Sequence, residues 1–346
     1  MDIRTLLEFA AENAASDLHL SAGSVPVVRV NGLLKKLNLP PLTDKAIREI
    51  TLPLLNPAQK ARFEERHEAD FAYEPDAAAR FRVNFFEQLK GISAVFRVIP
   101  GEIRSFEELG LPEIMKAFSL RERGLILITG PTGCGKSTTL AAMTDYINEN
   151  CAKHVITIED PIEFIHRNKK SLINQREVGT HTASFSAALR VAMREDPDVI
   201  LVGEMRDLET VSLALTAAET GHLVLATLHT SSAAKSIDRI IDIFPAGGKE
   251  QVRTQLSESV SGIVSQRLLP RRDGKGRVLA LEVLAVNTAV RNLIREDKIF
   301  QLPSVIQASA RQGMISMDMS LLDLLQKGLI SREEAVKIAE DPSKMK

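Results

Sequence analysis

The second half of the chain alternates short apolar runs with longer segments in which apolar residues recur at helical spacing. Four of the apolar runs have the length of buried strands: Leu125–Thr129, Val155–Ile158, Val199–Val202 and Leu223–Thr227. Strands that alternate with helices form a parallel sheet covered by helices. The pattern therefore predicts an α/β domain over residues 113–346, with a part that is mostly helical from about residue 270.

The first hundred residues follow a different pattern. A helical run at Ile3–Asn13 precedes alternating strands, Asp17–Leu20 and Val25–Val30, and a second strand pair, Arg80–Phe85 and Ile92–Ile99, follows a helical region. Within the third of these strands, arginines and an asparagine alternate with apolar side chains, so one face is polar and the other apolar. We expect a smaller α+β domain over residues 1–100, joined by a linker at 101–112 to the larger domain.

The composition is that of a globular protein: 44% of the 346 residues are hydrophobic, 26% are charged, and the formal net charge is −1. The absence of a long basic run disfavours non-specific nucleic-acid binding, which needs clustered Lys and Arg. The apolar stretch Val278–Val286 is interrupted by Glu282 and is too short to cross a bilayer. Acids within the first helical run argue against a signal peptide. Two cysteines cannot form a four-cysteine zinc site, and they are typical of a reducing compartment.

The strongest motif follows the first apolar run, where the sequence reads Gly130-Pro-Thr-Gly-Cys-Gly-Lys136-Ser137. A glycine-rich loop between a buried strand and a helix turns its backbone N–H groups toward one concavity, where they bind phosphate oxygens. The lysine of this motif binds the β- and γ-phosphates, and its serine binds Mg²⁺. The sequence thus predicts ATP and Mg²⁺ as cofactors. The expected cofactor-binding residues are Gly130, Pro131, Thr132, Gly133, Cys134, Gly135, Lys136, Ser137 and Thr138.

The phosphate loop also contains the thiol for which we expect the greatest reactivity. Cys134 lies at a helix N-terminus beside Lys136. Positive potential at such a position lowers the pKa of a thiol. We therefore expect Cys134 to react with alkylating reagents and to be protected by bound nucleotide.

Polar residues follow each of the other three predicted strands. Because the carboxyl ends of parallel strands meet at one edge of the sheet, these residues are expected to lie beside Lys136. Glu204 follows a hydrophobic strand and would hold Mg²⁺, directly or through water. One acid of the group Glu159, Asp160 and Glu163 would orient or deprotonate the attacking water. His229 follows the last strand, and its position at the same edge favours a part in the site.

Four long motifs resemble those of the secretion ATPase superfamily, and specifically of the type IV pilus retraction (twitching motility, PilT-type) ATPases. Ala15–Gly23 is similar to a segment of that family's PAS-like N-terminal domain, and Ile156–Glu163 resembles its aspartate box. Arg194–Asp207 resembles its Walker B region, and Gly221–Thr230 resembles its histidine box. The resemblance covers nearly the whole chain and implies a RecA-like motor domain with a parallel-rich sheet, preceded by a PAS-like α+β domain.

The resemblance also implies roles for particular residues. Glu163 is expected to be the catalytic glutamate, Glu204 the Walker B acid and His229 a sensor of the phosphate. Arginines of the N-terminal domain are expected to close over the γ-phosphate, and we assign this role to Arg82 and Arg97 before two further arginines, Arg104 and Arg123. The implied assembly is a homo-hexamer that hydrolyses ATP in the cytoplasm, at the bacterial inner membrane, against the platform protein of a pilus. No nucleic acid and no zinc are expected.

The segment Ala289–Glu296 resembles the Ala-Ile-Arg-Asn-Leu-Ile-Arg-Glu motif of retraction motors, with Val290 in place of isoleucine. On a helix its apolar residues would form a buried stripe, and we expect Arg291 and Arg295 to be exposed. The chain is therefore expected to couple ATP hydrolysis to pilus disassembly and retraction. The alternatives are a nucleic-acid translocase on the same core, a nucleotide-gated ring that regulates another motor, and an accessory retraction paralogue.

Overall fold

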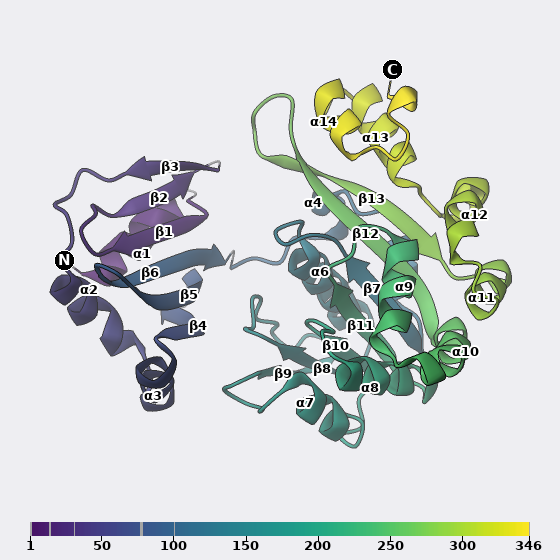
Figure 1. The fold of residues 1–346 in the computed structure, drawn as a ribbon, viewed down its shortest axis with the longest axis horizontal. Helices are drawn as coiled ribbons and strands as arrows, with labels where there is room; N and C mark the ends of the chain where they lie inside the picture. The colour runs from purple at the N-terminus through teal and green to yellow at the C-terminus, as the bar shows by residue number, and fades with distance from the viewer. Residues whose placement is uncertain (1, 14, 31, 77–78, 100, 346) are drawn as a thin grey trace. The chain divides into compact units, whose positions relative to one another are not determined.

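The computed structural model describes residues 2–13, 15–30, 32–76, 79–99 and 101–345. The chain forms two compact units, which Figure 1 colours from purple to yellow along the sequence. The first unit consists of residues 1–102 together with 161–165, and the second of residues 103–160 and 166–346. Within the described part of the chain, no helix is long and apolar enough to cross a membrane.

The first unit is a six-stranded antiparallel sheet with helices (Figure 1). Its strand order is β3-β2-β1-β6-β5-β4. The strands are β1 (Asp17–Ser21), β2 (Val27–Val30), β3 (Leu33–Lys36), β4 (Glu68–Asp76), β5 (Ala79–Gln88) and β6 (Gly91–Ile99). The helices are α1 (Ile3–Glu12), α2 (Asp44–Thr51) and α3 (Pro57–Arg66), with a 3₁₀ turn at Leu52–Leu54. Both predicted strand pairs are present, and β3 and β4 are strands that the sequence analysis did not predict.

The two faces of this sheet differ as the alternation predicts. Side chains from the three helices pack on one face against buried residues such as Leu18, Val83 and Phe96. On the other face, a row of charged residues crosses four neighbouring strands in register: Arg29, Asp17, Arg97 and Arg82. Residues that are direct cross-strand partners point to the same side of a sheet. Both arginines predicted for the γ-phosphate therefore lie side by side on the face without helices.

The second unit contains a seven-stranded sheet in the order β13-β12-β7-β11-β10-β8-β9. All neighbouring strands pair in parallel except β12 and β13, which are antiparallel. The strands are β7 (Gly124–Thr129), β8 (His154–Glu159), β9 (Leu172–Glu177), β10 (Val199–Val202), β11 (Leu223–Leu228), β12 (Val260–Pro270) and β13 (Arg277–Ala285). The predicted α/β fold with a parallel-rich sheet is confirmed, and all four predicted strands are present.

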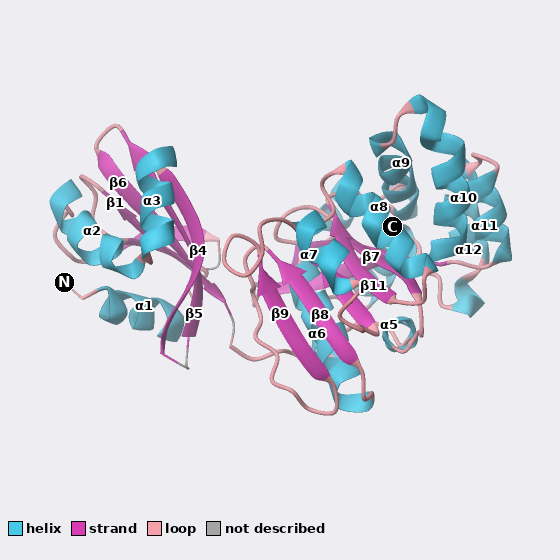
Figure 2. Ribbon diagram, turned by 90° about the horizontal axis from the view of Figure 1, so that it is seen from below, coloured by secondary structure: helices cyan, strands magenta, loops and turns pink. Residues whose placement is uncertain are grey.

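Helices cover both faces of this sheet (Figure 2). One face is covered by α4 (Phe106–Leu109), α5 (Ile114–Ser119) and α6 (Lys136–Asn150). The other is covered by α7 (Phe185–Ala192), α8 (Leu208–Glu219), α9 (Ala233–Ile243), α10 (Lys249–Ser259), α11 (Thr288–Arg295) and α12 (Leu302–Ala308). The segment predicted as a linker thus contains the short helix α4. Asp207 caps the N-terminus of α8, since it accepts a hydrogen bond from the backbone N–H of Thr210 at 2.8 Å.

The C-terminal part becomes helical later than the sequence predicts. The apolar stretch at 278–286 is mostly the strand β13, which pairs with β12 over nine residues from Pro270–Arg277 to Gly262–Ala285. The mostly helical part begins only with α11, and α13 (Met317–Gln326) and α14 (Arg332–Ile338) follow. Short 3₁₀ turns lie at Ala246–Gly248, Ile299–Gln301, Ala310–Gln312 and Pro342–Lys344. The strand escaped prediction because a 3.6-residue and a 2-residue period are hard to separate in a short apolar run.

Two acids are buried in this C-terminal part. Glu282 of β13 is 5% exposed, and one carboxylate oxygen accepts a hydrogen bond from the backbone N–H of Ala233 at 2.6 Å. Asp318 is 4% exposed and accepts hydrogen bonds from the backbone N–H groups of Glu340 and Asp341. Burial raises the pKa of Glu282 to about 7; the hydrogen bond from Ala233 opposes this shift, while the negative charges of Glu340 and Asp318 add to it. Folding therefore favours the protonated form of Glu282.

This raised pKa predicts a pH dependence of stability that Glu282→Gln should remove. Between the ordinary pKa of 4.5 and the folded-state pKa of about 7, the unfolded chain has lost the Glu282 proton while the folded chain keeps it. The wild-type free energy of unfolding should thus fall by about 3 kcal/mol relative to the glutamine variant across this range. Denaturant unfolding of both proteins at several pH values measures the difference. A difference that stays constant from pH 5 to 8 would contradict the assignment.

Candidate nucleotide site

The phosphate loop joins β7 to α6 with the backbone conformation that its glycines allow. Gly133 and Gly135 have φ values of 78° and 91°, a region that L-residues with a side chain rarely adopt. At Gly130, where φ is 142°, a Cβ atom would lie 2.6 Å from the carbonyl oxygen of Gln266 in β12. Glycine is therefore required at this position for close contact between loop and strand. The geometry is that of a cradle for phosphate oxygens at the start of α6.

Lys136 is the first residue of α6, and its side chain folds back over the loop. Its Nζ donates hydrogen bonds to the carbonyl oxygens of Gly130 at 2.9 Å and Pro131 at 3.1 Å. The ammonium group thus lies over the loop that would surround the phosphates. Ser137 and Thr138 follow in the first turn of the helix, the position from which the hydroxyl of this motif reaches a metal ion. The residues present fit a nucleotide with its Mg²⁺.

Glu204 and His229 lie together, as predicted from their positions after parallel strands. β11 pairs with β7 through Leu228 and Thr129, and β10 pairs with β11, so the two loops start at the same sheet edge. His229 Nε2 lies 3.1 Å from Glu204 Oε1, and Arg206 Nη2 lies 2.7 Å from Glu204 Oε2. Burial opposes ionisation of Glu204, but hydrogen bonds and charge from Arg206 and His229 give its carboxyl a net lowered pKa. Glu204 is therefore a carboxylate at neutral pH, as a ligand of a divalent cation must be.

The three acids after β8 are not equivalent. Glu159 ends the strand, and the Thr157 hydroxyl donates a hydrogen bond to its carboxylate at 2.7 Å. Glu163 belongs instead to the first unit, where the guanidinium of Arg82 lies 4.0 Å from its carboxylate. The role of Glu163 as the catalytic glutamate, which would orient or deprotonate the attacking water, remains a prediction.

The second predicted γ-phosphate arginine has a structural partner. Arg97 Nε donates a hydrogen bond to Asp17 Oδ1 at 2.9 Å, and Arg29 lies 3.7 Å from the other oxygen of the same carboxylate. The Asp17 side chain is 6% exposed, whereas that of Arg97 is 59% exposed. Removing Arg97 would leave a buried carboxylate with one of its two cations, which costs stability. The roles of Arg82 and Arg97 at a phosphate remain predictions.

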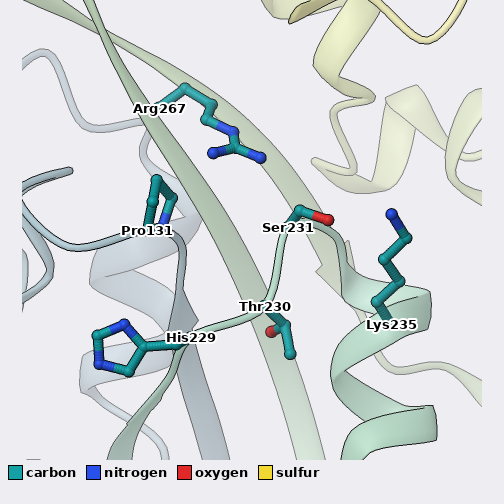
Figure 3. A pocket seen from close by; sticks show the side chains of 6 residues that line it. All are labelled: Pro131, His229, Thr230, Ser231, Lys235 and Arg267. Carbon is teal, nitrogen blue, oxygen red and sulfur yellow. The ribbon is translucent and has the colours of Figure 1, made fainter.

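A pocket beside the phosphate loop contains two cations that the sequence did not indicate. It is an open pocket of about 280 Å³ lined by Pro131, His229, Thr230, Ser231, Lys235 and Arg267 (Figure 3). Arg267 comes from β12, a strand that the sequence analysis did not predict, and Lys235 comes from the first turn of α9. Ser231 lies between the two cationic side chains in Figure 3. The sequence indicated this pocket only through the phosphate loop, which contains Pro131, and the loop of His229.

The prediction for Cys134 is wrong. The side chain is buried, with an exposed fraction of 3%, because the loop closes over it against β12. Burial raises the pKa of the Cys134 thiol above its ordinary value, and the opposing effect of Lys136 is smaller. At neutral pH the group is therefore a shielded thiol, and the thiolate is the reactive form.

The prediction that Arg291 is exposed is also wrong. Its side chain is 28% exposed, and the guanidinium donates hydrogen bonds to the carbonyl oxygens of Ser257 and Glu258, where α10 ends. Arg295 is 46% exposed and forms an ion pair with Glu258. The expected apolar stripe is present, because Val290 and Ile294 are buried and Leu293 is partly buried against the same core. Arg291 thus binds the last carbonyls of α10, and Arg295 remains the accessible cation of this segment.

The fold and the site together define a P-loop nucleotide-binding protein, and comparison with known proteins gives its family. A family model described as "Type II/IV secretion system protein" matches residues 1–336. The chain is 56% identical to the "Type IV pilus retractation ATPase PilT" of Pseudomonas aeruginosa over 342 residues, covering 99% of both chains. It is 42% identical to the "Type IV pilus ATPase PilU" of the same species, covering all of this chain and 91% of that protein.

A solved structure shares the whole fold. The crystal structure of the pilus retraction motor PilT with bound ADP superposes with a TM-score of 0.91 and 49% sequence identity, covering 99% of this chain and 98% of that one. The chain belongs to the type II/IV secretion system protein family. It is an ATPase of the pilus-retraction type within that family, and its resemblance to these motors is confirmed.

The shielded thiol predicts the order of cysteine reactivity. Cys134 should react with iodoacetamide at pH 7 at least ~10-fold more slowly than Cys151, because burial restricts access and its raised pKa lowers the thiolate fraction. Cys151 is the matched control, since it is only partly buried. Mass spectrometry of the two peptides over time gives both rates. Faster labelling of Cys134 than of Cys151 in nucleotide-free protein would restore the original expectation.

Proposed function

We propose that this chain is a ring-forming motor that couples ATP hydrolysis to the disassembly and retraction of a type IV pilus. The observation that carries the proposal is the contact between Glu204 and His229 at the sheet edge where the phosphate loop begins. The chain in which this contact occurs is 56% identical over 99% of its length to a pilus retraction ATPase. The identity to that protein, 56%, is greater than the 42% identity to PilU, which favours the retraction function named for the former. The pilus platform protein at the inner membrane is the proposed partner.

The proposed nucleotide is ATP bound with Mg²⁺. Lys136 would exchange its carbonyl partners for the β- and γ-phosphates, and the backbone N–H groups at the start of α6 would bind their oxygens. Ser137 and Glu204 are the proposed side chains at the metal ion. Bound Mg²⁺ supplies positive charge that stabilises the charge developing on the phosphates. The crystal structure of the related motor with ADP supports nucleotide binding by this chain.

Hydrolysis needs a group that orients and deprotonates water, and Glu163 is the proposed group. His229 would report the state of the γ-phosphate to Glu204, with which it already forms a contact. Arg82 and Arg97 would approach the γ-phosphate from the first unit, and in a ring the neighbouring copy is a source of such arginines. Six copies are proposed from the family resemblance. Movement of one unit relative to the other during the ATP cycle would then be transmitted around the ring.

The phosphate loop and the choice of acid are tested by three single variants. Lys136→Ala should abolish ATP hydrolysis, because it removes the charge that holds the β- and γ-phosphates. Glu163→Gln should bind ATP normally and reduce kcat by at least ~10²-fold, the usual effect of losing a general base. Glu159→Gln is the matched control from the same loop region. If Glu159→Gln is the slow variant and Glu163→Gln turns over normally, the two acids have been assigned the wrong way round.

The proposed arginines are expected to affect kcat more than nucleotide affinity. Arg82→Ala should reduce kcat with little change in the Kd of ATP, because its interaction forms mainly in the transition state. Arg97→Ala should reduce kcat and also lower the melting temperature, because Asp17 loses a cation. The double variant Asp17→Asn, Arg97→Ala removes the uncompensated carboxylate and should recover stability but not kcat. Recovery of kcat in the double variant would show that Arg97 acts only on the fold.

A variant in the segment 289–296 tests whether pilus retraction can be lost while ATP hydrolysis is kept. Arg295→Ala should fold and hydrolyse ATP normally, because an exposed ion pair contributes at most about 1 kcal/mol. If this segment contacts the platform protein, the same variant should fail to retract pili in cells. Lys298→Ala is the matched control, since it also removes one exposed cation from a surface ion pair. Normal retraction by Arg295→Ala at normal protein levels would exclude a role for this cation in coupling.

The translocase alternative has a separate test. Stimulation of the wild-type ATPase activity by added nucleic acid would favour it.

A further inference from the structure

A buried polar row links the phosphate loop strand to the helix that follows His229. Thr129 is the last residue of β7, and its hydroxyl lies 2.8 Å from the hydroxyl of Ser265 in β12. Ser265 is in turn the cross-strand partner of Glu282 in β13, so the three side chains share one face of the sheet. Their exposed fractions are 0%, 1% and 5%. Burying three polar side chains together is unfavourable unless each finds a partner, so their placement needs an explanation.

The carboxylate of Glu282 ends this row at α9. It accepts a hydrogen bond of 2.6 Å from the backbone N–H of Ala233, the first residue of that helix. This N–H is one of the helix-terminal donors that have no partner within the helix. The helix N-terminus also favours a negative charge at this position. Glu282 thereby fixes where α9 begins.

The beginning of α9 determines where the His229 loop lies. The hydroxyl of Ser236, one turn into α9, lies 2.6 Å from the hydroxyl of Thr230 and donates a hydrogen bond to the carbonyl oxygen of Ser232. Thr230 is the neighbour of His229, whose ring contacts Glu204 at 3.1 Å. Figure 3 shows the short path of the chain from His229 through Ser231 into α9. A shift of the first turn of α9 would therefore move the imidazole relative to Glu204.

The geometry points to Glu282 as a positioning residue for ATP hydrolysis, which holds the His229 loop in place by fixing the first turn of α9. Glu282 would act on His229 through α9, because its hydrogen bond is with Ala233, the first residue of that helix. The neighbouring charges that face it are Asp318 of α13 and Glu340, and Lys344 lies 3.8 Å from Asp318. The proposal concerns ATP turnover and rests on the ATPase part of the proposed function, not on pilus retraction.

Two substitutions at Glu282 separate the hydrogen bond from the charge. Glu282→Gln keeps the reach of the side chain and an acceptor oxygen but removes the charge. Glu282→Asp keeps the charge but withdraws the oxygen by about one C–C bond, ~1.5 Å. We expect kcat of the glutamine variant to stay within about threefold of wild type. The aspartate variant should lose at least ~10-fold in kcat with less than about threefold change in KM for ATP, because misplacement by ~1 Å slows chemistry more than it weakens binding.

Asp318→Ala is the control for loss of a buried carboxylate. Asp318 also accepts backbone N–H bonds, but its partners Glu340 and Asp341 lie in the C-terminal segment and not in α9. This variant should lower the melting temperature and leave kcat unchanged at a temperature where it is folded. A normal kcat in Glu282→Asp would overturn the proposal. So would equal losses in the two Glu282 variants, or a loss of kcat in Asp318→Ala as large as in Glu282→Asp.

A second site on the same path keeps the test decisive if Glu282→Asp does not fold. Ser236→Ala removes the hydroxyl that holds Thr230 and leaves β13 intact, and it should show the same fall in kcat with little change in KM. Ser257→Ala is its matched control, because this buried hydroxyl bonds only within α10. A normal kcat in Ser236→Ala would overturn the proposal. The ATP turnover of the wild-type protein is measured first. If the wild-type protein has no ATPase activity, the proposed function itself is refuted. If it is active, the effects of the variants test the role of Glu282 alone.

Discussion

The parallel register of β7, β11 and β10 is the constraint on which the site depends. Because Thr129 pairs with Leu228, the phosphate loop and the His229 loop leave the sheet at the same level. β10 adds Glu204 from the neighbouring position, and the contact between Glu204 and His229 follows directly from this alignment. A shift of one residue in either pairing would move every side chain of that strand to the opposite face. The backbone hydrogen bonds of the sheet therefore determine which side chains of these strands and loops can meet at the site.

Sequence reasoning succeeded where chemistry follows from local pattern. The glycines of the phosphate loop and the apolar strands before Lys136, Glu204 and His229 each have a signature within a few residues. It failed where the answer depends on a distant partner. Arg291 looked exposed on its own helix, yet it binds carbonyl groups more than thirty residues earlier in the chain. Cys134 looked activated by its neighbours in sequence, but packing against β12 removes it from water.

The hairpin of β12 and β13 is a further case in which a local sequence pattern does not reveal a distant partner, and here the partner matters for function. Glu282 was visible in the sequence only as an interruption of an apolar run, which is all that a local pattern can reveal about a buried acid. Its neighbours across the sheet and in α9 come from two separate segments, β12 and the start of α9. The arginine face of the first unit is an intermediate case. Alternation predicted a polar face for the strand of Arg82, but not that Arg97 lies beside Arg82 or that it pairs with the buried Asp17.

Lys136 already forms hydrogen bonds to two carbonyl oxygens of its own loop. Arrival of a phosphate is therefore an exchange of partners for the ammonium group, and departure restores the first set. The loop loses little conformational entropy when it binds, since its glycines already hold the required backbone angles. An idle subunit of a ring would consequently be ready for a fresh nucleotide as soon as the spent one leaves, with no refolding of the cradle to delay the next stroke.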